Sequence, residues 1–250
     1  MEAISKPDLS ARDVPNINAR YAGFTRLELA VILVAVALLA TVVLPALASS
    51  RPHSRRAACL NNLSRIGQAY SMWTTEHGGL YPWQSFTSGG GGGGQPFPLN
   101  NTWFQFAVLS NELTTPKILV CPSDESKRQA LDFSLNLGGG FLNANYRDNA
   151  VSYILGHPFL QEGRSVLSGD RNFVPNGGFG SSCPYFVSSW RISNPVIGVN
   201  WTTNLHMNTG NLLFNDGSVE QTDSAGLRAG FSNGTFDNAW IHLIYPDPPI

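Results

Sequence analysis

The amino-acid sequence predicts an α+β fold, in which one long N-terminal helix, with its first half transmembrane, packs on the antiparallel β-sheet of a globular domain. Three observations lead to this prediction. Residues Leu29 to Ala48 form a long apolar run without a charge. An apolar stripe at helical spacing follows that run. Short β-rich pieces separated by turn signals then fill much of the chain between residues 110 and 250.

The N-terminal helix is expected over residues 24–76. At about 1.5 Å per residue the apolar run spans about 30 Å, the hydrocarbon thickness of a bilayer, so residues 27–49 are expected to be transmembrane. Glu28 is a lone carboxylate at the head of the run, where a charge is costly to bury in lipid and usually functional. Gly78-Gly79 is expected to end the helix. Its extramembrane part carries the apolar stripe Leu60, Leu63, Ile66, Tyr70 and Trp73.

The remaining residues, 77–250, are expected to form the globular domain. Asp216-Gly217 lies between two apolar runs, which predicts a two-residue hairpin turn with positive φ. An extended strand before this turn would place His206 about 15 Å from Asp216, which excludes a direct acid–base pair. His206 is therefore expected to fix the start of the strand, although a metal or ligand role for either residue stays open. Strands are expected at 151–155, 185–190, 196–201, 212–214 and 219–221.

Composition and motifs argue against several classes of function. The formal net charge of −1 gives no sign of a nucleic-acid partner. Three cysteines without a C-x-x-C pair make a structural metal site unexpected. The chain has neither a G-x-S-x-G nor an H-E-x-x-H motif, so we expect no catalytic residues, no enzyme activity and no cofactor. The charges of Asp124-Glu125 and Asp170-Arg171 are interpreted as solvated loop charges, and the glycine run 89–94 as a flexible loop.

The start of the helix resembles the N-terminal signature of type IV prepilins and type II secretion pseudopilins. The residues that carry this resemblance are Gly23-Phe24-Thr25-Arg26-Leu27-Glu28, directly followed by the apolar run. The resemblance implies that residues 1–23 are a leader, that a prepilin peptidase cuts between Gly23 and Phe24, and that the new N-terminus is methylated. It also implies that Glu28 acts in assembly, where its carboxylate would pair with the amine of Phe24.

A second resemblance links three further segments to pilin-like proteins with a C-terminal H-x9-DG motif. Cys59-Leu60-Asn61-Asn62-Leu63 matches one of their helical segments, and residues 118–124 match their CPSD element. Residues 206–217 supply the motif itself through His206, Asp216 and Gly217. Three cysteines allow three pairings. The resemblance implies the pair Cys59 and Cys121, because Cys183 has no counterpart in the group.

Together these observations predict a pilin-like structural subunit that assembles into a filament or pseudopilus for secretion or a surface function. The expected partners are a prepilin peptidase, like subunits and inner-membrane lipid. The expected location is the inner membrane, with a single pass and a periplasmic globular domain. The alternative is a membrane-anchored or secreted binding module that does not polymerise, with carbohydrate as one candidate ligand. A secreted module would be cut after Ala48, at the small-x-small site.

Overall fold

The computed structural model describes residues 25–84, 101–156, 163–176, 179–180, 189–193, 196–233 and 240–246. The chain forms two compact units, residues 1–48 and residues 49–250, and each unit is described by itself. Helix α1, Arg26–Glu76, begins in the first unit and ends in the second. Its end coincides with the end of the predicted helix over 24–76, while Gly23 and Phe24 lie outside the described residues.

The prediction of a transmembrane first half is corrected by the structure. In the part of the chain that is described, no helix is long and apolar enough to cross a membrane. The predicted transmembrane segment 27–49 and the single-pass inner-membrane location are therefore wrong for the described residues.

Helix α1 ends where its glycines predict. Gly78 and Gly79 have φ of 66° and 84°, a region that side chains with a Cβ rarely adopt. The amide of Gly79 donates to the carbonyl of Thr74 at 2.7 Å, and the amide of His77 donates to Trp73 at 3.0 Å. The bond from Gly79 to Thr74 is the 6→1 bond of a Schellman motif, which satisfies a carbonyl left free at the end of the helix.

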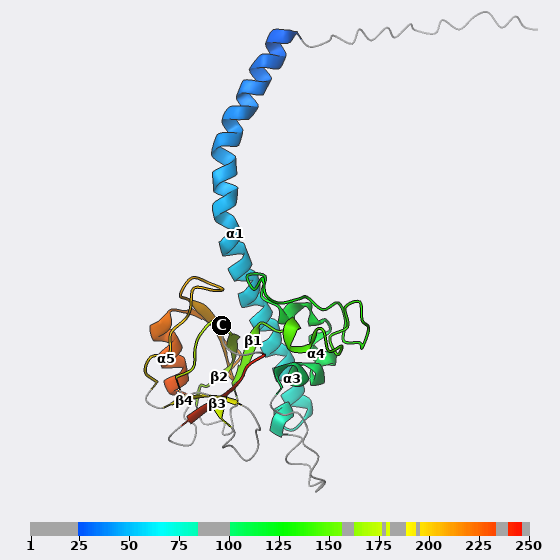
Figure 1. Ribbon diagram of the computed structural model, residues 1–250, viewed down its shortest axis with the longest axis vertical. Helices are drawn as coiled ribbons and strands as arrows, with labels where there is room; N and C mark the ends of the chain where they lie inside the picture. Colours follow the sequence, from blue (N-terminus) through cyan, green and yellow to red (C-terminus); the bar gives the residue numbers. More distant parts are fainter. Residues whose placement is uncertain are drawn as a thin grey trace, which may run out of the picture. The chain divides into compact units, whose positions relative to one another are not determined.

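The second unit contains a seven-stranded antiparallel sheet with the strand order β3-β4-β7-β1-β2-β5-β6 (Figure 1). The strands are β1 (Tyr153–Gly156), β2 (Val166–Asp170), β3 (Phe179–Gly180), β4 (Ser189–Ser193), β5 (Gly210–Phe214), β6 (Val219–Thr222) and β7 (Trp240–Ile244). The other elements are the α-helices α3 (Thr102–Val108), α4 (Ser110–Leu113) and α5 (Ser224–Asn233), and the 3-10 helices η1 (Pro116–Leu119) and η2 (Arg147–Ala150).

Both faces of the central strands are buried. Alternation along β1 sends Tyr153 and Leu155 to one face, where they join a core that contains residues of α1. Ile154, between them, joins a second core that contains residues of α5. The sheet is thus the middle layer of three. The contacts of the helices come from Leu63, Ile66 and Tyr70 of α1 and from Leu227 and Phe231 of α5.

Several predicted strands agree with the structure and others do not. Strands β1, β5 and β6 overlap the predicted strands 151–155, 212–214 and 219–221. The strand predicted at 196–201 is wrong: Trp201 makes only an isolated bridge, and Gly198 has φ of 78°, which interrupts an extended backbone. Residues 189–190 of the predicted strand 185–190 lie in β4, and its remainder lies outside the described residues. Strands β2, β3 and β7 were not predicted.

The β5–β6 hairpin was predicted from Asp-Gly, and its loop differs in one respect. Gly217 has φ of 81°, as expected, and its amide donates to the carbonyl of Phe214 at 3.0 Å. Within the loop 215–217 Gly217 alone has positive φ, which is typical of a type I turn followed by a left-handed glycine. The extra residue of the loop, Asn215, donates its backbone amide to the carbonyl of Ser165 at 2.9 Å.

Candidate functional site

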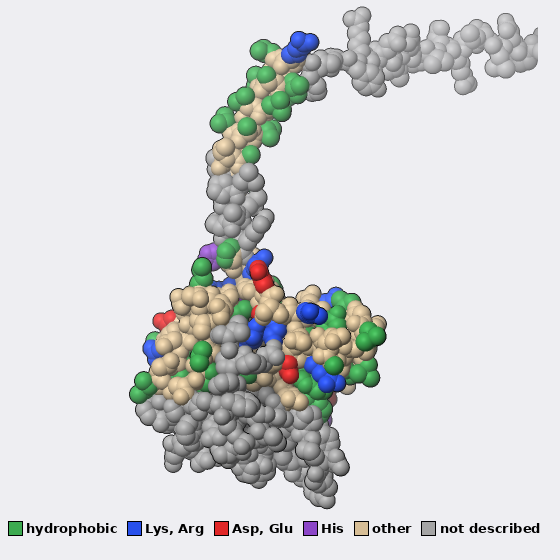
Figure 2. Space-filling model, in the orientation of Figure 1, with side chains coloured by type: hydrophobic (Ala, Val, Ile, Leu, Met, Phe, Trp, Pro, Cys, Tyr) green, Lys and Arg blue, Asp and Glu red, His purple; other side chains and the backbone are tan. Residues whose placement is uncertain are grey.

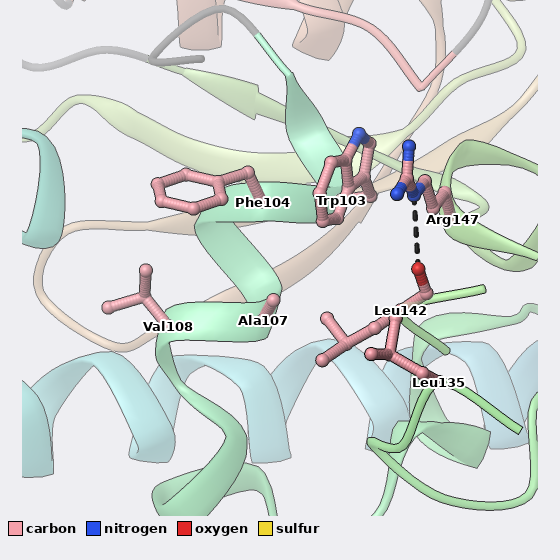
Figure 3. Close-up of a pocket in the computed structure, with 7 residues that line it drawn as sticks. All are labelled: Trp103, Phe104, Ala107, Val108, Leu135, Leu142 and Arg147. Carbon is pink, nitrogen blue, oxygen red and sulfur yellow. Dashed lines mark hydrogen bonds between the residues drawn. The ribbon is translucent and has the colours of Figure 1, made fainter. Parts of the chain in front are cut away.

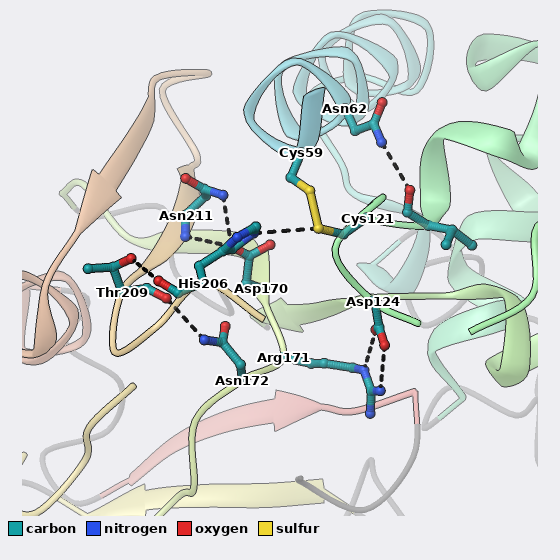
Figure 4. Close-up of a disulfide and its surroundings, with 11 residues drawn as sticks. Cys59, Asn62, Cys121, Asp124, Asp170, Arg171, Asn172, His206, Thr209 and Asn211 are labelled. Carbon is teal, nitrogen blue, oxygen red and sulfur yellow. Dashed lines mark hydrogen bonds and ion pairs between the residues drawn. A yellow bond between two sulfur atoms is a disulfide. The ribbon is translucent and has the colours of Figure 1, made fainter. Parts of the chain in front are cut away.

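His206 lies at the centre of a buried polar cluster on the loop that precedes β5 (Figure 4). Its Nε2 lies 3.5 Å from Sγ of Cys121 and 3.4 Å from Oδ2 of Asp170. Cys121 forms a disulfide with Cys59 of α1, the pair that the resemblance implied. The cluster therefore joins α1, the segment after η1, the end of β2 and the start of β5.

Asp170 is the buried carboxylate of this cluster. It is fully buried, and its Oδ2 accepts hydrogen bonds from the backbone amide of Asn211 at 2.7 Å and from Nδ2 of the same residue at 2.8 Å. Burial raises the pKa of Asp170 to about 7, and these two hydrogen bonds act in the opposite direction. The interpretation of Asp170 as a solvated loop charge was wrong, because the residue ends a strand whose neighbours cover it.

Arg56 of α1 holds the loop of His206 from the other side. Its Nη2 donates to the backbone carbonyl of His206 and, at 2.7 Å, to Oγ1 of Thr209. Burial, together with the charge of Arg56, lowers the pKa of His206 from 6.5 to about 4. The imidazole is therefore neutral near pH 7. Arg56 lies three residues before Cys59, so one turn of α1 provides both the guanidinium hydrogen bonds and the covalent contact to this cluster.

A second buried pair lies beside the first. Arg171, the neighbour of Asp170, donates from Nε and Nη2 to the two carboxylate oxygens of Asp124 at 2.8 and 3.0 Å. Both side chains are almost fully buried. Arg171 also donates to the hydroxyl of Ser126. The interpretation of Asp124 and Arg171 as solvated charges was therefore also wrong, because each one neutralises the other inside the protein.

The other end of the H-x9-DG motif lies apart from this cluster. Asp216 is half-exposed, pairs with Nε of Arg164 at 3.1 Å and accepts a hydrogen bond from the amide of Ser218 at 2.9 Å. Among the interactions of the described residues none joins Asp216 to His206. This agrees with the expected separation by a strand, so the two ends of the motif do not form one catalytic or metal site. Asp216 and Gly217 shape the hairpin loop instead.

Glu28 has a local role that the sequence did not suggest. Its carboxylate accepts hydrogen bonds from the amide and the hydroxyl of Thr25 at 2.8 and 3.0 Å, and its own amide donates to that hydroxyl at 3.2 Å. This reciprocal pattern is a capping box at the start of α1. The same hydrogen bonds, the backbone one first, lower the pKa of Glu28, so it is ionised. Gly23 and Phe24 lie outside the described residues.

A shallow apolar pocket of about 360 Å³ lies between α3 and the loop that precedes η2 (Figure 3). The guanidinium of Arg147 lies 4.5 Å from the centre of the Trp103 ring, and its Nε donates to the carbonyl of Leu142 at 3.1 Å. One face of the indole is thus covered by a cation. The lining residues are Trp103, Phe104, Ala107, Val108, Leu135, Leu142 and Arg147.

No protein-family model, no curated protein and no solved structure matches the chain. The candidate function therefore depends on the chain's own motifs and geometry. The cluster around His206 has a neutral imidazole beside a carboxylate, but both of its sulfurs are held in a disulfide. In this oxidised form it is a buried cross-link between elements, and its two cysteines offer no nucleophile.

Proposed function

We propose that the chain is a pilin-like structural subunit. A prepilin peptidase cuts it between Gly23 and Phe24, and the mature chains assemble through their N-terminal helices into a filament or pseudopilus. The prepilin-type signature at residues 23–28 supports the site of cleavage. Helix α1 begins at Arg26, two residues after the new N-terminus, so the mature chain would start with its helix.

The observation that carries the proposal is the exposure of the apolar side chains in the first unit. Among the described residues of this unit, the large apolar side chains are 45 to 77 % exposed, and they include the successive positions 31–34, which point to all sides of a helix with 3.6 residues per turn. Figure 2 shows such side chains along the face of α1 that is in view. A helix that is apolar all round needs partners all round. The helices of several like subunits would provide them, at about 25 cal/mol for each Å² of apolar surface removed from water. The exposed residues are Leu27, Leu29, Val31, Ile32, Leu33, Val34, Val36, Leu38, Leu39 and Val43.

The alternative, a carbohydrate-binding module, has less support. Sugar sites combine an open aromatic face with polar groups that bind hydroxyls. In the pocket beside α3, Arg147 covers one face of Trp103, and its Nε donates a hydrogen bond to a backbone carbonyl. The other lining side chains are apolar. The pocket thus fits an apolar contact better than it fits a sugar.

The mature N-terminus tests the proposal directly. The full chain is expressed with and without a prepilin peptidase, and its N-terminal peptide is identified by mass spectrometry. We expect a chain that starts at an N-methylated Phe24 only when the peptidase is present. A chain that keeps Met1 in its presence, or one that starts at Ser49, would contradict the proposal and favour the binding module.

Two variants give this experiment a matched control. Gly23→Leu places a large side chain directly before the cut and should leave the precursor uncleaved. Ala22→Leu places the same side chain one residue earlier and should be processed like the original chain. Assembly is then measured by sedimentation of filaments from cells that produce each variant. Equal processing of both variants would contradict cleavage after Gly23.

A further inference from the structure

Four potential metal ligands converge in the cluster around His206. The sulfurs of Cys59 and Cys121 and one ring nitrogen of His206 lie within 4.8 Å of one another, and all three residues are buried. The carboxylate of Asp170 adds a fourth donor, which lies near the same ring nitrogen (Figure 4). These four residues come from four separate segments of the chain, so no short sequence motif contains all of them.

Two of the separations between these donors are those of ligands around one ion. In a tetrahedral zinc site, with bonds of about 2.3 Å to sulfur and about 2.0 Å to nitrogen and oxygen, neighbouring sulfur and nitrogen ligands lie about 3.6 Å apart. Neighbouring nitrogen and oxygen ligands lie about 3.3 Å apart in the same geometry. Nε2 of His206 lies 3.5 Å from Sγ of Cys121 and 3.4 Å from Oδ2 of Asp170. Both observed distances match the edges of such a tetrahedron.

The distance between His206 and Asp170 is long for a hydrogen bond. An N–H···O bond in proteins spans about 2.7 to 3.2 Å, and the pair His206–Asp170 lies beyond that range. Oδ1 of Asp170 is buried and has no hydrogen-bond partner among the described residues. A buried carboxylate oxygen without a partner is costly. The cluster thus contains a carboxylate that its protein neighbours satisfy only in part.

We propose that Cys59, Cys121, His206 and Asp170 bind one zinc-type divalent cation when the disulfide is reduced. A dithiol reductant gives two electrons and two protons to the S–S bond and is itself oxidised to a disulfide, which leaves two protein thiols. Binding of the cation releases both thiol protons to solvent, because thiolates are the ligands. The sulfurs separate as the bond breaks, and the cation takes the place between them.

The surroundings favour a cation of this class. Two sulfurs and an imidazole select Zn²⁺ or Co²⁺ over Ca²⁺ and Mg²⁺, which prefer oxygen ligands. Asn211 donates to Oδ2 of Asp170 through its backbone and side chain, which fixes the orientation of the carboxylate as second-shell groups do in metal sites. Two thiolates and one carboxylate leave one excess negative charge around a divalent ion. The guanidinium of Arg56, bonded to the carbonyl of His206, supplies the compensating positive charge.

Cobalt provides a spectroscopic probe for this site. The full chain carrying Cys183→Ser, which removes the third thiol, is reduced with dithiothreitol, freed of reductant under argon and titrated with Co²⁺. We expect one equivalent to bind, with the visible bands of tetrahedral cobalt and a sulfur-to-cobalt charge-transfer band. Zn²⁺ should displace it, and the oxidised chain should show neither band.

Variants separate the ligands from their surroundings. His206→Ala and Asp170→Asn should each weaken Co²⁺ binding at least tenfold, whereas Asp216→Asn, a carboxylate of the same motif outside the cluster, should leave it unchanged. Circular dichroism follows the fold throughout. A reduced chain that unfolds and refolds when Co²⁺ is added also supports the site. Three outcomes would overturn it: no stoichiometric binding by the reduced chain, equal binding by the oxidised chain, or undiminished binding by His206→Ala.

Discussion

Asp124 and Arg171 form a bidentate ion pair in the interior of the globular unit, with 2.8 Å between Nε and Oδ2 and 3.0 Å between Nη2 and Oδ1. Asp124 lies three residues after Cys121, and Arg171 directly follows Asp170. The pair therefore holds together the two segments that also meet at His206. Its removal should affect the whole fold and with it the geometry of the polar cluster.

Arg171→Met should destabilise the protein by about 3–5 kcal/mol, because it leaves the carboxylate of Asp124 buried without its partner. The measurement is urea unfolding followed by circular dichroism. Arg55→Met is the matched control: Arg55 pairs with Glu125 at 3.3 Å on the surface, and exposed pairs contribute about 0–1 kcal/mol. A loss below 1 kcal/mol for Arg171→Met would contradict the role given to the buried pair.

Acid should weaken the same pair. Burial by itself raises the pKa of Asp124, but the hydrogen bonds of Arg171 and Ser126 and the Arg171 charge outweigh it and hold the pKa below 3.8. Because the folded-state pKa is the lower one, the carboxylate stabilises the fold above pH 3.8 and loses this effect as the pH falls through the folded-state pKa. The unfolding free energies of the original chain and of Asp124→Asn should therefore converge in acid. A constant difference down to the lowest measurable pH would argue against this.

Gly217→Val should destabilise the β5–β6 hairpin by about 1–2 kcal/mol, because a residue with a Cβ is strained in the left-handed region. Gly217 has φ of 81°, and an added Cβ would meet no atom within 4 Å, so the cost comes from the backbone and not from a clash. Gly217→Asn should cost less, since asparagine tolerates this conformation. Thermal unfolding of the two variants checks the order, and equal losses would point to a steric cause instead.

Glu28 combines a charge with a helix cap, and three variants distinguish the two. Glu28→Gln keeps a capping box but removes the charge that would pair with the amine of Phe24, so we expect processed subunits that do not assemble. Thr25→Ala removes the cap and keeps the charge, so filaments should still form. Glu28→Ala removes both. Filament yield is measured by sedimentation. A normal yield for Glu28→Gln would contradict the pairing of the Glu28 carboxylate with the amine of Phe24.

Local patterns in the sequence were enough to predict part of the fold. The stripe through Leu63 and Ile66 predicted the second part of α1, and Gly78 predicted its end. Asp216-Gly217 predicted a hairpin with positive φ at the glycine. In each case the signal and the structure lie within a few residues of one another, so short-range sterics and periodicity decide the outcome.

The buried polar cluster could not be predicted in this way. The partners of His206 lie 36 and 85 residues away along the chain, and Asp124 and Arg171 are 47 residues apart. From the sequence alone, a charged residue is interpreted as exposed to solvent unless its partner is known. Strand β2 was missed for a related reason: Val166–Asp170 ends in a serine, a glycine and a charge, yet all five residues are buried because neighbouring strands and helices cover both faces.

Arg56 and Cys59 make the attachment of α1 to the globular unit resistant to a pulling force. They lie one turn apart, and both are fixed to the segments around His206, one by hydrogen bonds from its guanidinium and the other by a covalent bond. A pull on α1 from the side of residue 49 meets these two attachments before it reaches the apolar contacts of Leu63 and Ile66. The covalent bond prevents the helix from sliding over the sheet, and the second attachment resists rotation. In a reduced chain the same pull would act on the hydrogen bonds of Arg56 and on side-chain packing, which yield at far lower force than a covalent bond.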